Sequence, residues 1–197
     1  MLGLAIIVIV AAIAIYAVNI LMFKPRYERR DAITKLLDGV SRAIYVYSDS
    51  FNEGAQISSE YTCDGENKNP HISWSGVPPD TRSIAILIYD KDSPGDYFIH
   101  WIVVGIPPDV YEVAEGIYTG GEAIYGVEGR NDFGYIGYGG PCPPPGEVHN
   151  YFVLVLALDR EIILDEGYSF EDFIDAVKGH VIVYGETRFV YSRAGST

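Results

Sequence analysis

Three short apolar runs constrain the fold of this chain more than any other feature of its sequence. They cover residues 83–89 (SIAILIY), 100–106 (HWIVVGI) and 151–158 (YFVLVLAL), with polar or Gly/Pro-rich segments between them. Continuous apolar runs of this length are typical of strands buried on both faces, and turn-rich connections favour antiparallel pairing. We therefore predict a mainly β fold, an antiparallel β-sandwich.

Weaker patterns predict the peripheral elements. Apolar residues at helical spacing follow Ser169 and stop before Gly179, which predicts a helix with Ser169 as its N-cap. Similar spacing within residues 27–40 predicts a second helix, which either forms a stalk or packs on the domain. Shorter strands are expected at 43–51, 72–74 and 181–191.

The N-terminal part of the chain contains an uncharged run of 22 residues, Leu2–Phe23. As a helix this run would be about 33 Å long, close to the thickness of a bilayer core at about 30 Å. A cleaved signal peptide is the alternative, but the run is longer than a usual signal core and no Lys or Arg precedes it. We predict a single-pass transmembrane anchor at 1–23, and hence a membrane partner.

Basic residues follow this run directly, and they suggest both an orientation and a division of the chain. They are Lys24, Arg26, Arg29 and Arg30. Such residues favour the cytoplasmic side, which would place the domain inside the cell. We divide the chain into the anchor at 1–23, a basic juxtamembrane segment with a short helix at 24–41, and the β domain at 42–197.

The charge of the domain excludes one class of partner. The whole chain carries a formal charge of −13, and after residue 30 it has ten Lys and Arg against 26 Asp and Glu, a net charge of −16. A domain this acidic repels the phosphate backbone of nucleic acids. We therefore expect no nucleic-acid binding.

The two cysteines, Cys63 and Cys142, both lie in Gly/Pro-rich loops. Neither has a second cysteine at the spacing of a structural zinc site. They would form a disulfide if their loops meet, a geometry that sequence alone does not give. Such a bond fits an exported domain better than a cytoplasmic one, and so conflicts with the orientation that the basic residues favour.

Polar residues at the ends of the predicted strands form a candidate site. They are Asp90, Asp92, His100, His149 and Tyr151. Three interpretations fit this set. Histidine and tyrosine donate hydrogen bonds to an anion, two histidines and an aspartate can hold zinc or iron, and the same residues can simply satisfy loop ends beside a core. Neither histidine belongs to a dense metal motif such as HExxH, and we predict no metal site.

Catalysis is the less well supported alternative. Ser93 is not in a GxSxG elbow, and a Cys142–His149 pair or a metal-assisted site would be needed for a hydrolase. We predict a non-enzymatic binding protein without a cofactor.

Several stretches of the chain resemble the phosphatidylethanolamine-binding protein (PEBP) family, specifically its bacterial and archaeal Raf-kinase-inhibitor-like branch. The resemblance covers about residues 44–193, in matching order and spacing. The stretches are YTCDGENKNPHISWSGVP (61–78), DKDSP (90–94), HWIVVGIP (100–107), GRNDFGYIGYGGPCPPPGEVHNYFVLVLALD (129–159) and KGHVI (178–182).

The resemblance implies a β-sandwich with peripheral helices and a small cavity for phosphate, phosphate-like ions or phospholipid headgroups. The family residues that line this cavity match Asp90, His100, His149 and Tyr151. The resemblance also implies regulation of a protein partner, as a kinase-pathway regulator or serine protease inhibitor, although no residue here marks that role.

Two loops of the family cavity have counterparts in this chain. The family's DPDAP turn matches residues 90–94, with Lys91 and Ser93 as departures, so Lys91 would bring a cation next to the site. The last proline of that turn is commonly cis in the family, which makes Pro94 a cis candidate. Gly140 and Pro141 match the pocket loop of the family.

Overall fold

The computed structural model describes residues 28–117 and 125–194. The predicted transmembrane anchor at 1–23 lies outside these ranges. Within them, no helix is both long enough and apolar enough to cross a membrane.

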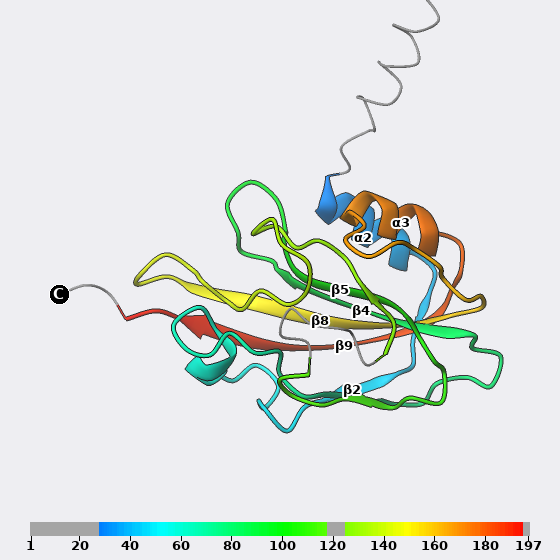
Figure 1. Cartoon of the computed structure of the whole chain (residues 1–197), viewed down its shortest axis with the longest axis horizontal. Helices are drawn as coiled ribbons and strands as arrows, with labels where there is room; N and C mark the ends of the chain where they lie inside the picture. Colours follow the sequence, from blue (N-terminus) through cyan, green and yellow to red (C-terminus); the bar gives the residue numbers. More distant parts are fainter. Residues whose placement is uncertain (1–27, 118–124, 195–197) are drawn as a thin grey trace, which may run out of the picture.

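The described residues form two β-sheets and two α-helices arranged in three layers (Figure 1). The larger sheet has the strand order β1-β9-β8-β4-β5-β7, and every pair in it is antiparallel except β1–β9. Its strands are β1 (Ser41–Arg42), β4 (Ser83–Asp90), β5 (Phe98–Ile106), β7 (Val127–Glu128), β8 (Val148–Leu158) and β9 (Val181–Ser192). The predicted mainly β fold is confirmed.

The smaller sheet covers one face of the larger sheet, and the helices cover the other (Figure 1). Its strands are antiparallel in the order β2-β3-β6, with bounds β2 (Tyr45–Tyr47), β3 (Ile72–Ser75) and β6 (Glu112–Val113). The helices are α2 (Arg29–Leu37) and α3 (Phe170–Val177), and a short 3-10 helix, η1, spans Ser59–Tyr61.

Alternation of side chains along the central strands explains the two cores. All eight residues of β4 are buried. Ile84, Ile86 and Ile88 belong to the core between the sheets. Ala85, Leu87 and Tyr89 belong to the core beneath the helices. Successive side chains of a strand point to opposite faces, so a strand covered on both sides needs an unbroken apolar run.

The helices have the ends expected from the sequence. The Ser169 hydroxyl accepts the Asp172 amide, and the Asp172 carboxylate accepts the Ser169 amide, which forms a capping box at the start of α3. Gly39 and Gly179 follow α2 and α3 with φ of 73° and 78°, the left-handed conformation that stops a helix. α2 packs into the core beneath the helices and β1 pairs with β9, so residues 28–42 are part of the domain.

The expected strand at 43–51 is shorter in the structure. Only Tyr45–Tyr47 pairs with β3. Beyond it, the Ser48 hydroxyl donates to the carbonyl of His71, and the Asp49 amide donates to the His71 ring. These side-chain hydrogen bonds replace the sheet ladder and end the strand.

Candidate functional site

Strand pairing brings the predicted site residues to one end of the sandwich. Asp90 is the last residue of β4 and lies opposite Tyr151 of β8. His149 is two residues before Tyr151, so both side chains point to the same face of the sheet. Asp90, His149 and Tyr151 have 5%, 4% and 0% of their surface exposed.

A β-bulge places His100 beside them. The pairing of β4 with β5 shifts from Ile88↔Trp101 to Tyr89↔Ile99, which leaves His100 as an extra residue. The bulge lets His100 and Trp101 follow one another on the sandwich side of the sheet, and bulges commonly re-aim a side chain in this way next to functional sites. The His100 ring then contacts the Tyr151 ring edge-on, with centroids 5.1 Å apart.

Three of these residues lie on the wall of a cavity of about 180 Å³, and Tyr151 contacts the two histidines without lining it. Its polar lining includes Asp90, His100 and His149. The remaining lining residues are Ser93, Pro94, Phe98, Phe133, Cys142, Pro143 and Pro144. The volume suits a small polar group rather than a large organic ligand.

His149 lies between two carboxylates. Its Nδ1 is 2.6 Å from Asp90 Oδ2, and its Nε2 is 3.1 Å from Glu147 Oε2. Burial disfavours the charged imidazole, but the hydrogen bonds to Asp90 and Glu147 outweigh it and raise the pKa of His149. Both ring nitrogens of the protonated form are donors.

The pKa of His100 is shifted in the opposite direction. Burial lowers the pKa of His100 to about 4, despite its hydrogen bond to the Gly139 carbonyl, so the ring is neutral at pH 7. Its Nδ1 is 2.5 Å from the oxygen of Gly139. A carbonyl only accepts, so Nδ1 carries the hydrogen, and Nε2 has a free lone pair.

Tyr151 lies against both imidazole rings. Its hydroxyl is buried and has no hydrogen-bond partner among the described residues. Burial raises the pKa of Tyr151, so the hydroxyl keeps its hydrogen and remains a donor. A buried hydroxyl without a partner is costly to the folded protein, which is a common feature of residues kept for binding.

Asp92 shapes the turn and does not line the cavity. Its Oδ2 accepts the Asn150 backbone amide at 2.8 Å and the Asn150 side chain at 2.7 Å. Burial opposes ionisation, but these hydrogen bonds hold the pKa of Asp92 below its ordinary value. The Asp92 amide donates to Asp90 Oδ1, which fixes the carboxylate that contacts His149.

One expectation for the turn at 90–94 is wrong. Every peptide bond among the described residues is trans, including Ser93–Pro94, and the trans form is favoured by about 0.5–1 kcal/mol even before proline. Lys91 lies next to the site, where its charge helps to lower the pKa of Asp92, but it does not line the cavity. Its side chain points to the opposite face of the sheet, where Nζ lies 5.1 Å from the centre of the Phe152 ring.

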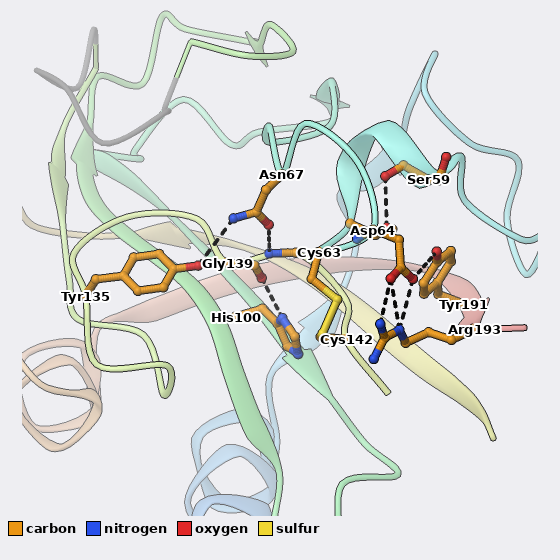
Figure 2. The surroundings of a disulfide bond; sticks show 12 residues. Ser59, Cys63, Asp64, Asn67, His100, Tyr135, Gly139, Cys142, Tyr191 and Arg193 are labelled. Carbon is orange, nitrogen blue, oxygen red and sulfur yellow. Dashed lines mark hydrogen bonds and ion pairs between the residues drawn. A yellow bond between two sulfur atoms is a disulfide. The ribbon is translucent and has the colours of Figure 1, made fainter. Parts of the chain in front are cut away.

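The pocket loop is fastened to its surroundings by backbone contacts and one disulfide. The Gly140 amide donates to Asn67 Oδ1, and the Pro141 carbonyl accepts the Cys63 amide. Figure 2 shows the bond between Cys63 and Cys142, which joins this loop to the segment after η1. Gly140 and Pro141 therefore support the loop, while Cys142 lines the cavity.

The Cys142 version of the hydrolase alternative does not fit this geometry. The Cys142 sulfur is bonded to Cys63, so it is not a free nucleophile beside His149. Within residues 28–117 and 125–194, no group of three His, Cys, Asp or Glu side chains is arranged to hold a metal ion.

Two features of the cavity were not expected from the sequence. Glu147 directly precedes β8 and contacts His149, and its position two residues before the histidine was the available signal. Phe98 and Phe133 form an aromatic wall with ring centroids 4.8 Å apart. Phe133 comes from a loop far along the chain, so local pattern gives no sign of that contact.

Comparisons with known proteins agree with the fold. The family model described as phosphatidylethanolamine-binding protein matches residues 47–192. A UPF0098 protein of Methanothermobacter thermautotrophicus is 44% identical over 142 residues, which cover 72% of this chain and 92% of the relative. The UPF0098 protein YbcL of Escherichia coli is 42% identical over 131 residues, covering 61% and 72%.

Two solved structures share the fold. Escherichia coli YbcL, described as a member of the mammalian PEBP family, aligns with a TM-score of 0.71 at 34% identity, covering 76% of this chain and 98% of YbcL. CT736 of Chlamydia trachomatis, described as a PEBP homologue, aligns with a TM-score of 0.70 at 34% identity, covering 78% and 99%. The chain belongs to the phosphatidylethanolamine-binding protein family.

Proposed function

We propose that this protein is a non-enzymatic binding protein whose cavity takes a tetrahedral oxyanion that also brings a hydrogen-bond donor. Hydrogen phosphate and a phosphate headgroup with an ammonium share this chemistry. The observation that carries the proposal is the pairing, in one cavity, of a neutral His100 with a protonated His149 beside the unpartnered Tyr151 hydroxyl.

The donors and acceptors of the cavity differ in kind. The Tyr151 hydroxyl is a donor without a partner among the described residues, which suits an oxygen of an anion. Both N–H groups of His149 already meet carboxylates, so a ligand oxygen would take the place of the exposed Glu147 at Nε2. His100 Nε2 accepts, so the group that meets it needs a hydrogen of its own, either P–O–H or N–H. Sulfate and simple phosphodiesters have only acceptor oxygens at neutral pH, and they would leave this nitrogen unpaired at a cost of about 1–3 kcal/mol.

Charge supports the same ligand class. Asp90 and Glu147 place two carboxylates around the single positive charge of His149. A fully deprotonated anion would be repelled by this surplus of negative charge. A ligand with an acidic hydrogen or an ammonium group reduces that repulsion.

Membrane attachment through residues 1–23 is part of this proposal. The hydrophobic run Leu2–Phe23 supports it, and a tether would raise the effective concentration of the cavity near lipid headgroups. The test is fractionation of the full-length chain: residence in the membrane pellet after a high-salt wash supports the tether, and release into the supernatant contradicts it.

Calorimetric titration of the full-length protein tests the ligand class. The probes are inorganic phosphate, sulfate, dimethyl phosphate and glycerophosphoethanolamine, a headgroup diester that carries an ammonium. We expect binding of phosphate and glycerophosphoethanolamine only. The tighter of the two distinguishes a free-phosphate site from a headgroup site.

A pair of histidine variants completes the test. His100→Ala should weaken phosphate binding about tenfold or more. His180→Ala is the matched control, because His180 contacts Asp159 rather than a cavity residue. The proposal fails if no probe binds, if sulfate binds as tightly as phosphate, or if both variants retain the same affinity.

Inhibition of a serine protease or regulation of a kinase pathway remains a prediction from the family resemblance. An inhibition assay with a panel of serine proteases tests it directly.

A further inference from the structure

Helix α2 begins beside the candidate cavity and receives its N-terminal cap from a cavity loop. The residue before the helix, Glu28, makes no side-chain cap. Instead the Asp96 carboxylate accepts the Arg29 amide at 2.6 Å and the Arg30 amide at 3.0 Å. Burial opposes ionisation of Asp96, but these amides and the Arg29 charge lower its pKa. The turn that supplies Ser93 and Pro94 to the cavity is thus bound to the start of α2.

The Arg29 side chain reaches a second cavity loop. Its guanidinium lies 2.6 Å and 2.7 Å from the two Asp132 carboxylate oxygens and also donates to the Tyr97 carbonyl at 3.2 Å. The Asp132 carboxylate accepts the Ile99 amide at 2.6 Å as well. The paired side chains are only 23% and 16% exposed. A planar guanidinium with two carboxylate contacts fixes both partners in orientation as well as in position.

The two loops that meet at Arg29 both line the cavity. Pro94 and Phe98 flank the segment that contacts Arg29 on one side, and Phe133 directly follows Asp132 on the other. The aromatic contact between Phe98 and Phe133 depends on how these loops are held. Arg29 precedes residues 47–192, which the family model matches, whereas Asp132 lies within them.

We propose that Arg29 is a positioning residue that holds the segments 93–98 and 131–135 together, so that ligand affinity depends on how the chain enters the domain. The ligand part of this inference rests on the proposed function. Without the Arg29 side chain, Asp132 keeps its hydrogen bond to Ile99 but loses its ion pair. The start of α2 is then no longer bound to both segments, 93–98 and 131–135.

The test combines local hydrogen exchange with phosphate titration, both on the full-length protein in the same detergent buffer. Arg29→Ala should speed amide exchange in 93–99 and 131–135 of the ligand-free protein about tenfold and weaken phosphate binding about fivefold. Lys35→Ala is the matched control on the same helix. The Lys35 side chain is 78% exposed and forms an ion pair with Asp31, 3.8 Å away on the same helix, so neither quantity should change.

Two further variants separate positioning from a general loss of stability. Arg29→Lys should give intermediate values, because one ammonium keeps the charge pair but not the forked contact. Asp132→Asn keeps an acceptor for Ile99 and removes the charge that binds Arg29. Combined with Arg29→Ala, it should add little to the effect of either single change, since both remove one interaction.

Each outcome bears on the inference. Unchanged exchange at both segments in Arg29→Ala overturns it, whatever the ligand. Faster exchange with unaltered phosphate affinity also overturns it, because the contact then serves the fold and not the cavity. If amide exchange rises in Arg29→Ala but the unaltered protein binds no phosphate, the positioning role of Arg29 between the two segments is supported and the proposed function fails.

Discussion

His149 and His100 line one cavity, yet their surroundings shift the imidazole pKa in opposite directions. Hydrogen bonds to Asp90 and Glu147 outweigh burial and favour the charged form of His149. For His100, burial prevails over its hydrogen bonds to the backbone of Gly139 and Gly140 and favours the neutral form. Two residues of the same type therefore serve as a donor and an acceptor at the same pH.

The raised pKa of His149 predicts a pH dependence of stability above neutrality. A histidine whose pKa rises on folding stabilises the protein fully below its ordinary value of 6.5, and this contribution is lost as pH rises through the folded pKa. The free energy of unfolding of the unaltered protein should therefore fall, relative to that of His149→Asn, as the pH is raised from about 6 to about 9. Denaturant titrations across this range measure it, and parallel pH profiles would contradict it.

The titration of His100 does not interfere with that measurement. Its pKa of about 4 lies below the ordinary value of 6.5, so its linkage acts on the acid side. The stability it contributes is present above the ordinary value and is lost as the pH falls towards the folded value.

Removal of the Tyr151 hydroxyl should separate stability from binding. The hydroxyl is buried without a partner among the described residues, so Tyr151→Phe should leave the free energy of unfolding unchanged or raise it by up to about 1 kcal/mol. The same change removes a donor beside the ligand and should weaken phosphate binding about tenfold. Denaturant unfolding and calorimetry on the same preparation measure both effects. A large loss of stability without a loss of affinity would show that the hydroxyl serves the fold.

Among the structural elements, the pocket loop is the one held by a covalent bond. The disulfide joins cysteines separated by 79 positions, and both residues are exposed to solvent. Closing a loop of this length restricts the unfolded chain. Reduction should therefore lower the free energy of unfolding by about 2–4 kcal/mol.

The measurement is denaturant unfolding with and without a thiol reductant. A double variant, Cys63→Ser with Cys142→Ser, is the control. Its free energy of unfolding should equal that of the reduced protein and should not change when the reductant is added. If reduction alters the double variant equally, the effect does not come from this bond.

The elements also show what the sequence was able to predict. Strand β4 and helix α3 follow from local patterns, because an unbroken apolar run and a capping serine carry their own signals. The positions of Asp90, His149 and Tyr151 at one strand end followed from the same runs together with the family resemblance. These elements are determined mostly by residues close together in the chain.

The remaining features depend on contacts between distant residues. The bulge at His100 appears only when β4 and β5 adopt their register. The contact between Arg29 and Asp132 joins residues 103 positions apart, which no local period encodes. The strand expected at 43–51 was shortened by hydrogen bonds to His71, another distant residue. Tertiary contacts overrode local propensity in each case.

On the scale of the whole molecule, the His149 side chain, whose surroundings favour its positive charge, lies within an acidic domain. The chain after residue 30 has a net charge of −16, so its long-range field repels free anions. Under the proposed function, attraction of an anion within the cavity would therefore come from contacts over a few ångströms, chiefly those of His149. A tether such as the one proposed for residues 1–23 would compensate for slow encounter by keeping the cavity near its ligand.

The parallel pairing of β1 with β9 has a consequence for the order of assembly during synthesis. Ser41 is paired with Val183, so β1 takes its strand partner from near the end of the chain, whereas Arg29 of α2 finds Asp96 and Asp132 earlier in the sequence. Strand β9 must leave the ribosome before β1 has a neighbour to pair with. Strand β1 is therefore synthesised early and paired late, after the other strands of its sheet have been made.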